Sequence, residues 1–84
     1  MFWLPAAATL VPGDRLIGAR GGRLALCPES WLGAVHVDRR GLAELLRPLV
    51  LELPIERVLV SHGEPVLRDG RAALVRAIAE AEAG

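Results

Sequence analysis

The sequence has no excess of either charge and a single cysteine, and each of these two shortages excludes a class of function. Ten arginines balance ten acidic residues. A domain without surplus positive charge lacks the usual electrostatic attraction for nucleic acid or for an anionic membrane surface. One cysteine, Cys27, cannot form an internal disulfide. We therefore expect no nucleic-acid or membrane partner, and a reducing, cytoplasmic setting.

Long hydrophobic runs are also absent. The apolar opening is interrupted by Pro5, has no basic flank and is far shorter than the roughly 20 residues of a membrane-spanning helix. We expect the run at residues 2–4 to lie in a sheet. There is no repeat of solenoid length and no low-complexity tract. Residues 1–84 are expected to form one partial domain.

Apolar residues, in contrast, are abundant. They make up 52% of the chain before its nine glycines are counted, against roughly 45–50% with glycine included in ordinary globular proteins. A chain of this size buries only roughly 60–65% of its surface on folding. The surplus predicts an apolar face that packs against another surface.

The first third of the chain has the pattern of short strands separated by turns. Residues 9–11 are stopped by Pro12 and the glycine after it, and residues 16–17 by Gly18. A further strand is expected at 24–26. Residues 57–60 are uniformly apolar after the first, which predicts a strand buried on both faces.

Two helices are expected. The first begins at Asp38 as N-cap, and Pro48 should kink or end it after Arg47. Its expected apolar face comprises Leu42, Leu45, Leu46, Leu49 and Val50. The second helix opens at Asp69, with an expected apolar face of Leu74, Val75 and Ile78.

Two ionisable residues follow apolar strands directly. Asp14 follows residues 9–11 through Gly13, and His62 follows residues 57–60. In α/β folds, loops at the carboxyl ends of strands are where ligand-binding groups converge. Carboxylate and imidazole are ligands for Zn²⁺ or another divalent transition metal, although a catalytic site typically has three protein ligands or more. Asp14 and His62 are therefore the candidate metal ligands.

These motifs, in their order, resemble the C-terminal half of a metallo-β-lactamase-fold hydrolase. The match comprises residues 9–14, a leucine-rich helix, the strand at 57–60, the segment Ser61, His62, Gly63, Glu64 and Pro65, and a closing helix. The resemblance implies an α/β fold with one sheet and two covering helices, half of a four-layer αββα sandwich. It also implies that Asp14 and His62 bind metal, and assigns no other ligand.

The family's His-x-His-x-Asp-His motif is absent, since the only other histidine is His36. The resemblance thus implies a fragment that contributes ligands, is inactive alone and needs a missing N-terminal half; its substrate is not readable from the sequence. The alternative is a non-catalytic remnant or interaction module that dimerises through its apolar sheet face.

Other functional interpretations are weaker. Cys27 with His36 could form a thiol nucleophile and base, but a small buried thiol is the simpler expectation. Trp3 and Trp31 are expected as core or interface anchors rather than as pocket walls. Glu64 either orients His62 or faces solvent, and we favour solvent.

Overall fold

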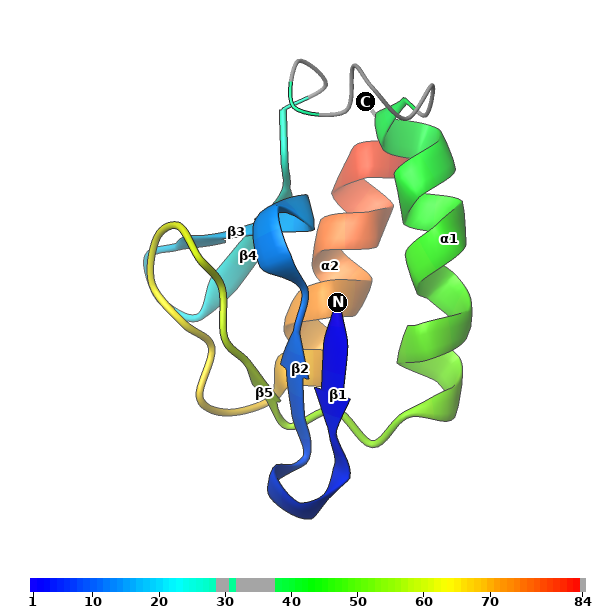
Figure 1. The fold of residues 1–84 in the computed structure, drawn as a ribbon. Helices are drawn as coiled ribbons and strands as arrows, with labels where there is room; N and C mark the ends of the chain where they lie inside the picture. The colour runs from blue at the N-terminus through cyan, green and yellow to red at the C-terminus, as the bar shows by residue number, and fades with distance from the viewer. Residues whose placement is uncertain (29–30, 32–37, 84) are drawn as a thin grey trace.

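The protein is a mixed α/β structure with two small sheets and a pair of helices (Figure 1). The computed structural model describes residues 1–28, 31 and 38–83. The elements in order are β1 (Phe2–Leu4), η1 (Pro5–Ala7), β2 (Thr9–Val11), η2 (Gly13–Arg15), β3 (Leu16–Ala19), β4 (Arg23–Leu26), α1 (Arg39–Glu52), β5 (Arg57–Val58) and α2 (Gly70–Ala83). Here η denotes a short 3₁₀ helix.

The strands form two sheets, whereas one sheet was expected. The first has the order β1-β2-β5, with β1 antiparallel and β5 parallel to β2; the second is the β3-β4 hairpin. Pro12 lacks an N–H for a sheet ladder, and Gly13, at a φ of 67°, turns the chain into η2. The chain therefore leaves the first sheet before β3 begins.

The first sheet has one buried face and one outer face. Trp3, Leu10 and Val58 are paired in register and lie on the inner face; Leu10 and Val58 are fully buried, and Trp3 packs against the core as expected. Side chains alternate along a strand, so the neighbouring residues point outward. The outer face of the first sheet carries Phe2, Leu4, Val11 and Leu59.

The strand at residues 57–60 is therefore not buried on both faces. It is shortened to Arg57–Val58, and Leu59 is 40% exposed. The physical reason is that α2 contacts β5 from the core side, while no described residue covers Leu59 fully on the other. Some of the apolar residues that exceed the needs of the core are thus exposed on the outer face of the first sheet.

Helix α1 begins as expected, because Asp38 Oδ1 accepts a hydrogen bond from the Gly41 N–H at 2.7 Å. The helix does not end after Arg47, since α1 continues through Pro48 to Glu52. A proline removes its own N–H from the ladder and its ring crowds the carbonyl four residues earlier, but beyond Pro48 the Leu53 N–H donates to Leu49 O at 2.9 Å. Burial of the apolar face on both sides of Pro48 offsets that loss.

The two helices are antiparallel neighbours (Figure 1). Arg40 at the start of α1 donates to Glu82 O near the end of α2, and Arg71 at the start of α2 donates to Leu53 O after α1. Two expected core positions are exposed instead, Leu45 at 64% and Val75 at 53%. The buried stripe of α2 consists of Ala73, Leu74, Ala77, Ile78 and Ala81. Its alanines favour a stripe centred on Ala77, which leaves Val75 outside it.

Among the described residues, neither helix is long and apolar enough to cross a membrane. Cys27 is buried in the core, as expected for a small thiol. His36 lies outside the described residues, so its suggested pairing with Cys27 falls there as well.

Candidate metal site

Asp14 lies at the carboxyl end of β2. Pro12 is buried and ends the strand, and Gly13 turns the backbone so that Asp14 falls in η2. Its side chain is 71% exposed. The carboxylate is therefore fixed by a rigid local turn while its oxygens remain open to a ligand.

His62 lies beyond the carboxyl end of β5. The chain turns at Gly63, whose φ of 86° is favourable only for glycine. The carbonyl oxygen of His62 accepts a hydrogen bond from the N–H of Gly18 in β3 at 2.9 Å. The imidazole itself is 55% exposed.

The two side chains meet, as the strand ends predict. Nε2 of His62 lies 3.2 Å from Oδ1 of Asp14. The reason is topological: β2 and β5 are parallel neighbours, so their carboxyl ends fall at one edge of the sheet. Residues far apart in the sequence thus form one surface pair of a carboxylate and an imidazole.

This separation suits a shared metal ion as well as a direct hydrogen bond. Two donors bound to one ion at about 2.0–2.2 Å, at angles near octahedral or tetrahedral, lie roughly 3.0–3.5 Å apart. The observed 3.2 Å falls in that range. Among the described residues there is no group of three or more potential metal ligands. The pair is therefore at most part of a metal site.

Trp31 is the residue whose place the sequence did not predict. Its ring centroid lies 5.2 Å from that of His62, with the ring planes at 57°. It was expected as a core or interface anchor, yet it is 48% exposed. No periodicity marks Trp31, because it lies in a 3₁₀ turn and not in a strand or an α-helix, so its contact with His62 depends on the tertiary fold.

Glu64 is exposed, as favoured from the sequence. Within the described part of the chain, the carboxylate in contact with the His62 imidazole is that of Asp14 and not that of Glu64. The imidazole is thus oriented by Asp14 and flanked by Trp31.

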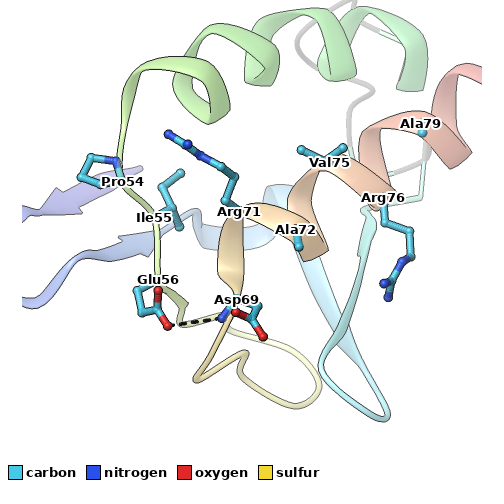
Figure 2. Close-up of a pocket in the computed structure, with 9 residues that line it drawn as sticks. All are labelled: Pro54, Ile55, Glu56, Asp69, Arg71, Ala72, Val75, Arg76 and Ala79. Atoms are coloured by element: carbon cyan, nitrogen blue, oxygen red, sulfur yellow. Dashed lines mark hydrogen bonds between the residues drawn. The ribbon is translucent and has the colours of Figure 1, made fainter.

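A groove of about 710 Å³ lies elsewhere, between the segment after α1 and the first turns of α2 (Figure 2). Glu56 and Asp69 lie at one end, where Glu56 Oε1 accepts the Asp69 N–H at 3.5 Å. Val75 and Ala79 form part of its apolar wall. Neither Asp14 nor His62 lines this groove.

The chain matches no protein-family model, no curated protein and no solved structure. The resemblance to metallo-β-lactamase-fold hydrolases consequently rests on the two motifs alone and stays a prediction.

Proposed function

We propose that this chain contributes two ligands, Asp14 and His62, to the divalent-metal site of a metallo-β-lactamase-like hydrolase. The observation that carries the proposal is the 3.2 Å contact between His62 Nε2 and Asp14 Oδ1. Both groups are exposed enough to accept a ligand and are held at the ends of parallel neighbouring strands. The donor set of one imidazole nitrogen and one carboxylate oxygen fits Zn²⁺.

In this function the chain does not work alone. A catalytic zinc typically has three protein ligands, and the described residues bring only two together. A bound divalent ion supplies Lewis-acid polarisation of a carbonyl or phosphoryl oxygen. The residues of this chain hold the ion, and a second half completes the site.

The outer face of the first sheet supports a missing half. Phe2 is 71% exposed, Leu4 46% and Leu59 40%, on a sheet whose other face packs against the core. Sheets that pack face to face bury such side chains between them. In the proposed half-sandwich this face receives the second sheet.

Zinc titration by calorimetry tests the ligand assignment. We expect weak, sub-stoichiometric binding to the wild-type chain, and loss of binding in His62→Ala and in Asp14→Asn. The matched control is His36→Ala, which removes the only other histidine and should leave binding unchanged. Tight one-to-one binding that survives His62→Ala, or no binding to the wild type, contradicts the proposal.

A second candidate function follows from the same outer face: a module that associates with a second copy of itself. Strand β1 is at the edge of its sheet, and residues 1–4 carry no charged side chain to oppose pairing with another copy. The apolar side chains are too few for the roughly 800 Å² per partner of a standard interface. We therefore expect a weak homodimer, whose test opens the Discussion.

A further inference from the structure

The backbone of β3 and the loop that carries His62 approach each other unusually closely. Gly18 N–H donates to His62 O at 2.9 Å. A Cβ added at Gly18 would lie 1.8 Å from Glu64 O, and one added at Gly63 would lie 2.0 Å from Gly18 O. Real Cβ atoms essentially never come within 3.0 Å of another heavy atom, so any side chain at either position must displace the backbone.

Gly18 and Gly63 crowd each other's segments, whereas Gly70, where an added Cβ would lie 2.9 Å from Glu56 O, approaches a different part of the chain. Cβ atoms added at Gly13, Gly21 and Gly22 would meet nothing within 4 Å, although all three have positive φ. Those three glycines allow the positive φ of a local turn. Gly18 instead leaves space for the close approach of two segments that are distant in sequence. The close approach is where β3 meets the chain after β5, outside either sheet ladder.

The contact also relates the two candidate ligands to one another. Asp14 lies in η2, which runs directly into β3, and Gly18 lies in β3 itself. The Gly18 to His62 hydrogen bond therefore ties the His62 loop to the same short segment that presents Asp14. We infer that Gly18 and Gly63 are positioning residues, which hold the His62 imidazole against Asp14. The effect of these glycines on metal binding rests on the proposed function, whereas their effect on the position of the imidazole does not.

The experiment compares Gly18→Ala with Gly21→Ala. Gly21 lies in the turn of the same hairpin, so its substitution strains the backbone without touching the His62 loop. The first readout needs no metal: it is proton NMR of the His62 imidazole, whose resonances we expect the Trp31 ring, with its centroid 5.2 Å away, to shift. Circular dichroism confirms that each variant is folded.

We expect the His62 resonances of Gly18→Ala to move toward those of Trp31→Phe, while Gly21→Ala keeps the wild-type shifts. Zinc binding should weaken by about 10–100-fold in Gly18→Ala, as for loss of other groups that orient a ligand. A folded Gly18→Ala with wild-type His62 shifts overturns the inference.

If Gly18→Ala does not fold, NMR measurements on the wild-type chain test the contact between β3 and the His62 loop instead. Slow exchange of the Gly18 amide and an Overhauser effect between the α-protons of Gly18 and Gly63 support the contact; absence of either overturns it. Failure of the proposed function is distinguished separately. In that outcome the NMR results hold while neither the wild type nor any variant binds zinc.

Discussion

Replacing Phe2 by glutamate should abolish self-association of this chain. Phe2 lies on the outer face of the first sheet and is 71% exposed, so its replacement should change the stability of the folded monomer little. In a dimer formed through that face, the substitution exchanges an apolar contact for a buried carboxylate without a partner. The free energy of association should therefore change much more than the free energy of unfolding.

The magnitude follows from the exposed area. A phenylalanine side chain buries roughly 200 Å² when fully covered, and Phe2 has 71% of its surface still to bury. At about 25 cal/mol per Å², the remaining burial of about 140 Å² contributes at most about 3.5 kcal/mol per copy. Since about 1.4 kcal/mol is tenfold in affinity, loss of one such contact weakens Kd by up to about 300-fold.

Sedimentation equilibrium over a range of concentrations measures this Kd directly. The matched control is Leu51→Glu, because Leu51 is 74% exposed but lies on α1 rather than on the sheet. We expect Leu51→Glu to associate like the wild type and Phe2→Glu to be monomeric. A monomeric Leu51→Glu together with a dimeric Phe2→Glu would place the interface on the helices and refute the reasoning.

Three further predictions test the fold and the site. Pro48→Ala restores a helical N–H at an exposed position and should raise the free energy of unfolding by about 1–3 kcal/mol in urea denaturation, whereas a decrease would show that the proline is needed for packing. Leu16→Ala, at a fully buried position directly after η2, should lower it by about 2–5 kcal/mol in the same assay. Cu²⁺ should quench the fluorescence of Trp31 in the Trp3→Phe variant because His62 lies beside that indole, and quenching that persists after His62→Ala would place the metal elsewhere.

The sequence predicted the meeting of Asp14 and His62 better than it predicted the elements around them. The end of each strand is a local feature of the sequence, whereas the parallel pairing of β2 with β5, which brings the two loops to one edge, joins distant segments and was not itself predicted. The N-cap of α1 is likewise a local feature, and it was predicted. Metal binding by this pair stays a prediction, because neither the sequence motifs nor the contact between Asp14 and His62 tests it.

What the sequence did not give depends on contacts between distant segments. The free-energy cost of Pro48 inside α1 is a local property of the helix. The burial of Leu46 and Val50, which offsets that cost, depends on the packing of α2. The exposure of Leu59 depends on which face of the sheet α2 covers. The contact of Trp31 with His62 involves no regular element that periodicity could reveal.

The metal pair and the outer sheet face are linked by the strands themselves. Val11 and Leu59, on the outer face, each precede a candidate ligand by three residues. A surface that packs on them therefore reaches the edge where Asp14 and His62 meet. In the proposed hydrolase, the chain that buries the outer face is thus placed to supply the missing ligands. Leu59→Glu should accordingly weaken both the pairing of the two halves and the metal affinity of the completed site, whereas His62→Ala should weaken the metal affinity much more than the pairing.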